Sequence, residues 1–241
     1  MYERVKGVVL HTIKYNDKNA VVKVYTDTHG IIPFLLPQGS GKVARMRRAL
    51  FQPLSIVEIE TDIVPHRDIY RILQVHCLQP LANLHTDPVK NAVALFVTEL
   101  LSHVIVEQEE NAPLFSYVSS SVALLDRIER GVANFHLCFL YNLGLFIGIE
   151  PDVATYEEGR IFDMMNGVFI DGLPLHGHFL SREESAVLYR LSRINYENMH
   201  LYRFNRQQRM RLLELMLDYY RLHSSAIGEL RSPAILSALF E

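Results

Sequence analysis

The chain has 241 residues, of which 49% are hydrophobic and 21% charged, and its formal net charge at pH 7 is −3. This composition is that of a globular protein with a substantial core, and it excludes a disordered chain. No run approaches the ~18 consecutive apolar residues of a membrane-spanning helix, and the charged N-terminus lacks the apolar region of a signal peptide. We therefore expect a cytoplasmic protein with no membrane partner.

The charges are distributed unevenly along the chain. Residues 1–80 contain 11 Lys and Arg against 7 Asp and Glu, a net charge of +4, whereas residues 81–241 contain 13 against 20, a net charge of −7. A basic segment followed by an acidic one indicates different partners for the two parts. We interpret the basic part as binding nucleic acid and the acidic part as binding protein.

Residues 1–80 are expected to form a small β-barrel. Short β-rich runs recur along this segment with turn residues between them, and they are Val5–Thr12, Ala20–Thr26, Ile31–Leu36, Leu54–Glu60 and Ile69–Cys77. This pattern predicts a five-stranded OB-type β-barrel, because closure removes the exposed edges of so short a sheet. We expect the barrel to be a separate domain.

From residue 81 onward the apolar residues recur with a helical period. Helices are expected over Asp87–Glu107, Pro113–Arg130, Val132–Ile147, Asn205–Ser224 and Ser232–Phe240, and another is expected to begin at the Ser181–Glu184 capping box. Residues 132–147 are apolar on almost all sides and are expected to be central. Asn166-Gly167 predicts a β-hairpin near 159–172. The chain is thus assigned to the α+β class, with a mostly α-helical domain over 81–241.

The clearest candidate binding site is the segment Gly39–Arg48, which contains no acidic residue and is expected to be a loop between the third and fourth strands. Its glycines allow the backbone to conform to a nucleic-acid strand, and its cations suit phosphates. The predicted DNA-binding residues are Lys42, Arg45, Arg47 and Arg48, extended on the same face by Lys6, Lys14 and Lys23. Tyr15, Tyr25 and Phe34 are expected to stack on bases. The alternative is a solvated basic loop without a partner.

Catalytic arrangements are not recognisable in the sequence. The GSGK segment lacks the Gly-Lys-Ser/Thr ending of a nucleotide-binding loop, and no nucleophile lies in a recognised motif beside a base. We therefore expect a protein that is not an enzyme and needs no cofactor. A metal-dependent enzyme with zinc at His176 and His178 is the alternative that the histidines leave open.

Arginines gather at the start of the predicted helix 205–224. Cations at a helix N-terminus oppose the helix dipole, which indicates an acidic partner outside the chain or, alternatively, carboxylates of the same domain. The candidate partner contacts here are Arg206 and Arg209.

The order and spacing of several short motifs resemble the RecO family of bacterial recombination and repair mediators. In the basic part the motifs are Gly7–His11, Lys14–Asp17, Tyr25–Gly30 and Leu50–Leu54. In the helical part they are Thr98–Leu101, Pro113–Phe115, Phe135–Leu140 with Leu143-Gly144, Tyr219–Arg221 and Leu230–Ser232.

This resemblance implies that the chain binds single- and double-stranded DNA and anneals complementary strands. It also implies that the chain, with a RecR-type mediator, assists recombinase loading on DNA covered by single-strand-binding protein. A pocket for the acidic C-terminal tail of that protein is expected on helix 132–147, with Arg127, Arg130 and Leu137 as candidate contacts. The alternative is a protein-interaction scaffold whose barrel binds a protein.

The sequence departs from the family pattern in two places. Many members carry a four-cysteine zinc site in the region of residues 151–178, where this chain has no cysteine, so we expect no metal and a hairpin held by packing alone. The family's usual basic run after the third strand is Pro37–Ser40 here, and the cations come later. Cys77 and Cys138 are expected to be buried, reduced thiols.

Overall fold

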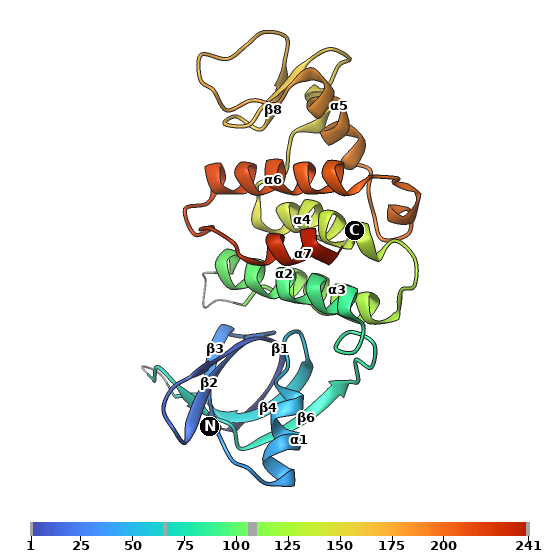
Figure 1. The fold of residues 1–241 in the computed structure, drawn as a ribbon. Helices are drawn as coiled ribbons and strands as arrows, with labels where there is room; N and C mark the ends of the chain where they lie inside the picture. Colours follow the sequence, from blue (N-terminus) through green and yellow to red (C-terminus); the bar gives the residue numbers. More distant parts are fainter. Residues whose placement is uncertain (1, 65–66, 106–109, 240–241) are drawn as a thin grey trace. The chain divides into compact units, whose positions relative to one another are not determined.

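The computed structural model describes residues 2–64, 67–105 and 110–239, which fall into two compact units, Met1–Ile128 and Glu129–Glu241. We call these the N-terminal and the C-terminal unit. The N-terminal unit contains a curled sheet with helices, and the C-terminal unit contains helices and a small hairpin (Figure 1). This confirms the α+β class. The predicted domain boundary after residue 80 falls inside the N-terminal unit and stays a prediction.

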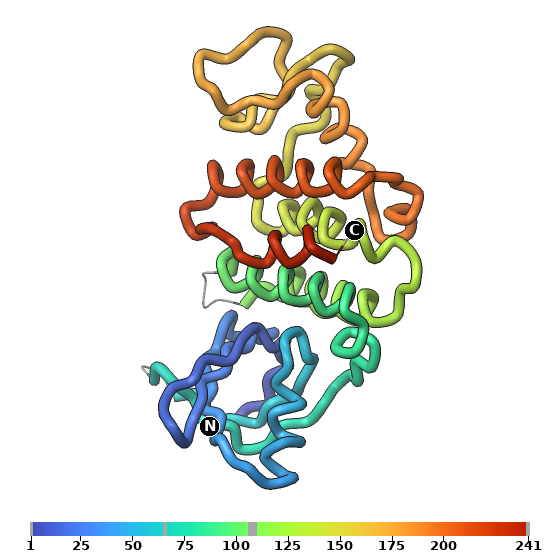
Figure 2. Tube along the Cα trace, viewed as in Figure 1, coloured from blue at the N-terminus to red at the C-terminus, as the bar shows by residue number. Residues whose placement is uncertain are grey.

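The β-strands of the N-terminal unit form one curled, six-stranded sheet (Figure 2). In chain order they are β1 Tyr2–Lys14, β2 Asn19–Thr26, β3 Gly30–Pro37, β4 Ile56–Asp62, β5 Tyr70–Arg71 and β6 Gln74–Gln79. Their order in the sheet is β5-β3-β2-β1-β4-β6. Alternate side chains, among them Val9, Val22 and Phe34, form its buried core. This is the OB-type barrel that the sequence predicts.

The predicted fifth strand is in fact two strands at opposite edges of the sheet. β5 pairs in parallel with β3, whereas β6 pairs antiparallel with β4, although only Ile72 and Leu73 separate them. One chain segment therefore protects both edges, which otherwise offer unpaired backbone groups to other chains. Because β6 lies on the outside with few buried side chains, the expectation that Cys77 is buried is wrong. Cys138 is buried as expected, and both thiols are free.

The predicted loop between the third and fourth strands contains a helix, α1, over Lys42–Leu50. The expectation of an irregular loop is wrong because Ala, Arg, Lys, Met and Leu, which make up eight of these nine residues, are all good helix formers. The helix begins after Gly41, and no residue of α1 is buried.

Strand β1 changes partner along its length. Tyr2–Val8 pairs with β4, whereas Gly7–Lys14 pairs with β2, and an irregularity in register between Val9 and His11 follows the change. A β-bulge of this kind bends a strand and increases its twist. At the change lies Gly7, where a Cβ atom would be 2.3 Å from Cγ1 of Val24. A side chain at this position would push the two strands apart.

Helices α2 (Pro88–Val104) and α3 (Ala112–Arg127) complete the N-terminal unit. The side chain of Asp87 caps α2 by accepting from the backbone N–H groups of Val89 and Lys90. The buried carboxylate of Asp126, at the end of α3, accepts from two backbone N–H groups that precede α2, both at 2.8 Å. Ser102 of α2 hydrogen-bonds His11 of β1 at 3.2 Å, which ties the helices to the sheet.

The C-terminal unit agrees closely with the predicted elements. Its helices are α4 Val132–Ile147, α5 Arg182–Leu191, α6 Arg206–His223 and α7 Ser232–Leu239, with 3₁₀ turns η1 Val153–Thr155 and η2 Met199–Leu201 and a hairpin of β7 Ile161–Asp163 and β8 Val168–Ile170. The Ser181–Glu184 capping box opens α5 as predicted. None of the helices among the described residues combines the length and apolar composition needed to cross a bilayer.

Helix α4 is the buried centre of the C-terminal unit, as its sequence predicts. The side-chain amide of Asn134 donates to the carbonyls of Met199 and Tyr202 at 2.9 and 2.7 Å, which fixes η2 against α4. His136 is fully buried, and burial, with a smaller effect of Arg209, lowers its pKa from 6.5 to about 3. The imidazole is therefore neutral in the folded state at neutral pH.

We expect His136 to make the protein less stable as the pH falls. Below pH 6.5 the unfolded chain protonates this imidazole, whereas the folded state excludes the proton until about pH 3. The free energy of unfolding should therefore drop by about 1.4 kcal/mol between pH 7.5 and 5.5 from this residue alone. Urea denaturation of the wild type and of His136→Leu at both pH values measures the difference. The matched control is His200→Leu, since His200 is exposed, and an unchanged pH dependence in His136→Leu would contradict the assignment.

Candidate nucleic-acid interface and partner groove

Helix α1 presents the predicted cations on the surface of the N-terminal unit. Lys42, Arg45 and Arg48 are exposed and Arg47 is half-buried. Arg47 and Arg48 lie in the last turn, where cations interact favourably with the helix dipole. The guanidinium of Arg48 donates to the carbonyl of Gly39 at 3.1 Å, which ties α1 to the segment that precedes it. The helix thus carries four cations and no acidic residue.

A cleft of about 500 Å³ lies beside α1, and we call it the turn cleft. It is lined by the β1–β2 turn, the end of β3 and the end of α1, and its polar lining residues include Lys14, Asn16, Gln38 and Arg48. Lys14 forms an ion pair with Asp17 at 3.0 Å, but both side chains are highly exposed, so the pair is weak. The structure therefore brings Lys14 and Arg48 together, as the sequence predicts.

Hydrogen bonds to the side chain of Asn16 order the β1–β2 turn. The side-chain oxygen of Asn16 accepts from the backbone N–H groups of Lys18 and Asn19, both at 2.9 Å. The adjacent Tyr15 is 61% exposed and is available for stacking on a base. Tyr25 and Phe34, in contrast, are fully buried, so the expectation that they stack on bases is wrong. Phe34 lies in the core of the barrel, whereas Tyr25, next to the core residue Val24, faces the other side of the sheet and packs against Phe115, with ring centroids 5.7 Å apart.

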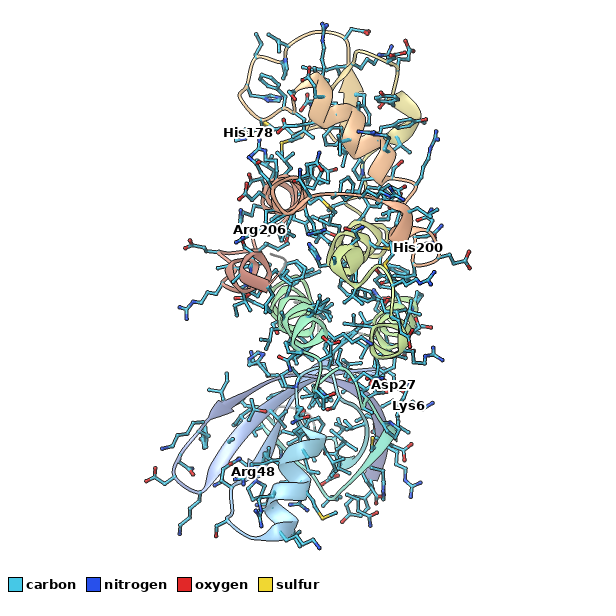
Figure 3. The ribbon with its side chains drawn as sticks, turned by 45° about the vertical axis from the view of Figure 1, so that its right-hand side comes forward. Lys6, Asp27, Arg48, His178, His200 and Arg206 are labelled. Atoms are coloured by element: carbon cyan, nitrogen blue, oxygen red, sulfur yellow. The ribbon has the colours of Figure 1, made fainter. Side chains whose placement is uncertain are left out.

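Two of the predicted lysines lie away from the turn cleft. Lys6 is exposed on the N-terminal half of β1, where its backbone N–H donates to Asp27 at 3.0 Å, and Figure 3 shows this pair well separated from Arg48. Lys23 is half-buried opposite His11, whose pKa is lowered by burial and then by Lys23 and His103. The seven predicted cations do not form one continuous face.

The predicted partner contacts on and near α4 have different environments. Arg127 and Arg130 are exposed, but Leu137 is fully buried and offers no surface to a partner. Asn134, at the start of α4, is engaged by η2 through the carbonyl of Met199. Neither Leu137 nor Asn134 can therefore line the pocket that was expected on helix 132–147.

A larger groove of about 1080 Å³ lies in the C-terminal unit between α5, η2 and the start of α6, and we call it the arginine groove. Its apolar lining includes Val187, Leu201, Phe204, Met210 and Leu215. Its basic end is lined by Arg190, Arg203 and Arg206. These residues meet because the Tyr202 hydroxyl donates to the carbonyl of Arg190 at 3.0 Å, which joins the end of α5 to the start of α6.

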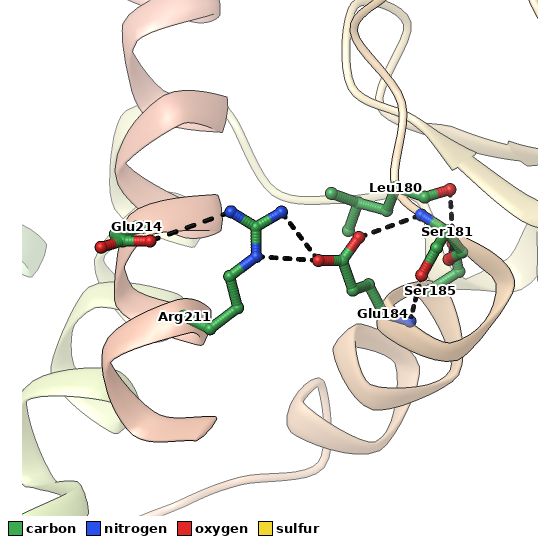
Figure 4. A network of polar contacts seen from close by, with 6 residues as sticks. All are labelled: Leu180, Ser181, Glu184, Ser185, Arg211 and Glu214. Atoms are coloured by element: carbon green, nitrogen blue, oxygen red, sulfur yellow. Dashed lines mark hydrogen bonds and ion pairs between the residues drawn. The ribbon is translucent and has the colours of Figure 1, made fainter. Parts of the chain in front are cut away.

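The opposite end of the groove is closed by an ion-pair network (Figure 4). Two guanidinium nitrogens of Arg211 contact Glu184, both at 2.8 Å, and a third lies 3.8 Å from Glu214. Burial alone raises the pKa of Glu184, but the Ser181 backbone N–H and Arg211 hold that pKa below its ordinary value. The network fixes α5 against α6 and leaves the groove with one acidic and one basic end.

Arg209, a predicted partner contact, faces into the C-terminal unit. Its guanidinium donates to the side chain of Asn134 at 3.1 Å and to the carbonyl of Phe204 at 2.8 Å, and burial lowers its pKa. Arg206 is exposed and contacts Ser237 of α7 at 3.5 Å. Of the two predicted arginines, Arg206 thus lines the groove, whereas Arg209 supports the wall behind it.

The polar contacts of the hairpin region centre on a buried carboxylate, and residues 151–178 contain no cysteine. The buried carboxylate of Asp163 accepts from the backbone N–H groups of Met165 and Asn166 and from the Asn166 side chain, and His176 lies 3.3 Å away. These contacts engage the oxygens that a metal would need. Over the described ranges, no three His, Cys, Asp or Glu side chains form a metal-binding group. The expectation of packing alone is wrong, because polar contacts centred on Asp163 also hold the hairpin.

Sequence reasoning missed most of the arginine groove. The arginine cluster at the start of helix 205–224 was recognised, but Arg190 and the apolar lining residues lie on several elements that no motif connects in the sequence. Asn16 and Gln38 of the turn cleft were missed as well. The signal for Asn16 was available, because an Asx residue in a tight turn before a strand indicates a structured hairpin connection.

Two family models match the chain. The model for the N-terminal region of recombination protein O matches residues 1–81, and the model for its C-terminal region matches residues 85–232. Proteins named DNA repair protein RecO are similar over the full chain, with 40% identity in Phocaeicola vulgatus and 39% in Bacteroides fragilis, each covering 100% of both chains. The one from Porphyromonas gingivalis is 32% identical and covers 98% of both chains.

We expect Tyr15→Ala to weaken binding of a single-stranded oligonucleotide by about tenfold, since stacking on an aromatic side chain contributes ~1–3 kcal/mol per base. The fold should be unaffected because Tyr15 is exposed. Fluorescence anisotropy with a labelled oligonucleotide measures the affinity, and thermal denaturation checks the fold. Tyr2→Ala is the matched control, because Tyr2 is 71% exposed at the other end of β1. Equal affinity of Tyr15→Ala and the wild type would argue against stacking at the β1–β2 turn.

Proposed function

Because the chain belongs to the recombination protein O family, a family of DNA repair proteins, we propose that it is a recombination mediator that binds and anneals DNA strands. It binds single- and double-stranded DNA through α1 and the turn cleft. With a RecR-type mediator it assists recombinase loading on DNA covered by single-strand-binding protein. This activity makes and breaks no covalent bond, so it needs neither a catalytic residue nor a cofactor.

The observation that carries this proposal is helix α1 beside the turn cleft. Four cations without an acidic residue on an exposed helix attract a polyanion, and phosphate contacts of this kind carry no sequence information. Such binding suits a mediator that acts at any sequence. The cleft adds Lys14 at the β1–β2 turn, where Tyr15 is also exposed, and that turn is one of the loops with which OB-folds bind oligonucleotides.

Replacing Lys42, Arg45, Arg47 and Arg48 together with alanine should weaken single-strand binding and make it less salt-dependent. Each phosphate contact on a single strand contributes ~0.7 to the slope of log K against log salt, so losing four contacts lowers the slope by up to about 3. Affinity is measured by anisotropy over a range of salt concentrations. Annealing of complementary oligonucleotides is measured in parallel and should slow by at least about tenfold.

The matched control removes four other exposed cations from the same unit, Arg4, Arg67, Arg71 and Arg127. The control keeps the net charge of the first variant but leaves α1 intact, so its salt slope should stay close to that of the wild type. If both variants lost the same slope, binding would depend on net charge and not on α1. If neither changed, the barrel would bind a protein and the scaffold alternative would be favoured.

The arginine groove supports a proposal for the tail of single-strand-binding protein. An acidic peptide matches a groove with three arginines at one end, and the apolar floor offers contacts to the apolar side chains of such a peptide. Arg206 was a candidate contact from the sequence, whereas Leu137 is buried. We therefore propose the groove, and not helix α4, as the tail site.

We expect Arg203→Ala with Arg206→Ala to weaken binding of this acidic peptide by about tenfold, which corresponds to about 1.4 kcal/mol. Anisotropy with a fluorescent peptide measures the affinity, and thermal denaturation checks the fold because Arg206 contacts Ser237. The comparison variant, Arg127→Ala with Arg130→Ala, removes the alternative cations that the sequence suggests. A loss in the comparison variant alone would move the site away from the groove.

A further inference from the structure

Helix α1 exposes two large apolar side chains among its cations. Val43 is 78% exposed and Met46 is 63% exposed. They lie three positions apart, so they are neighbours on the helix surface, and Met46 also lies one turn from Lys42. Single exposed apolar residues are common, but an adjacent pair on a helix with no buried residue calls for a ligand that covers it.

The charges of α1 define the chemistry of that ligand. Lys42, Arg45, Arg47 and Arg48 favour a polyanion, and a phosphate backbone cannot cover apolar side chains because phosphates keep their water. The apolar surface that a nucleic acid offers is the faces of its bases. These faces are stacked inside a duplex, and they are accessible in a single strand.

Resting on the DNA-binding function proposed above, we propose that Val43 and Met46 contact the faces of unstacked bases in a single strand whose phosphates are bound by the cations of α1. Contacts of this kind leave the Watson–Crick edges of the bases free. The bases of the bound strand then cannot stack on one another, while their Watson–Crick edges remain available to a complementary strand. This arrangement gives α1 a preference for single strands that phosphate contacts alone do not provide.

The continuity of the surface supports this assignment. Arg48 belongs to α1 and also lines the turn cleft, so a strand bound along the helix leads directly to Lys14. Tyr15, in the same turn, offers a further stacking surface. Base contacts on α1 and in the turn would thus follow one another along the same strand.

The test compares an oligothymidine with an abasic deoxyribose-phosphate oligomer of equal length. Both carry the same phosphates, and only the first carries bases. The wild type should bind the oligothymidine more tightly. Val43→Ser with Met46→Ser should reduce this preference at least about fivefold, because the variant buries less apolar area against the bases. The salt slope for both ligands should stay unchanged in that variant. The variant with all four cations of α1 replaced by alanine should lower the salt slope equally for both ligands.

Two further variants guard against indirect effects. Leu73→Ser with Leu78→Ser alters two other exposed apolar residues of the same unit, which are 42% and 43% exposed, and should leave the preference unchanged. Met46→Lys adds a cation, so it should strengthen binding to both ligands while still lowering the preference for bases.

The outcomes separate this inference from the function on which it rests. Suppose that the double serine variant keeps the wild-type preference for bases, while the four-cation variant has a lower salt slope. That result would overturn the base contacts and leave DNA binding by α1 intact. Unchanged binding in both variants would overturn the assignment of α1 as the DNA site. A serine variant that keeps DNA binding but loses a protein partner would show that the apolar pair is a protein contact.

Discussion

The N-terminal unit depends on the way in which β1 is shared between two neighbours. Its first half pairs with β4 and its second half with β2, so this one strand must bend where it changes partner. The register irregularity at Val9–His11 supplies the bend, and Gly7 allows Val24 to approach at the point of change. Because the sheet curls, the β1–β2 turn and the end of α1 come to line the same cleft. A flat sheet would leave Lys14 and Arg48 apart.

The curled sheet places the cations of the N-terminal unit in different environments. Lys14 and Arg48 of α1 line the same cleft, whereas Lys23 lies opposite His11, which hydrogen-bonds Ser102 of α2. The contribution of a cation to DNA binding therefore depends on its position, since only cations that lie along one path can contact successive phosphates. Val43 and Met46 are exposed on the same helix as Arg48. Electrostatic attraction and apolar contact are thus supplied by neighbouring side chains of one short helix.

Much of the fold follows from local sequence signals, and much of the site does not. The limits of α4, the capping box of α5 and the Asn166-Gly167 turn are set by nearby residues, so the sequence predicts them well. The split of the fifth strand depends on two distant partners, and alternation cannot reveal it. Tyr25 and Phe34 show the same limit: their strands were predicted, but which face is covered depends on packing. The arginine groove joins α5, η2 and α6, which no spacing connects.

The hairpin, the helix α5 and the arginine groove are linked by polar contacts that need no metal. Asp163 orders the turn between β7 and β8, and the backbone N–H of Phe162 in β7 donates to the buried hydroxyl of Ser185 in α5 at 2.8 Å. One residue earlier, Glu184 binds Arg211 of α6 and so sets one end of the groove. Hydrogen bonds to charged groups contribute about 1.5–3 kcal/mol each, so a few of them can provide the order that a bound metal provides in other proteins. These contacts fix the wall of the groove in a region, residues 151–178, that contains no cysteine.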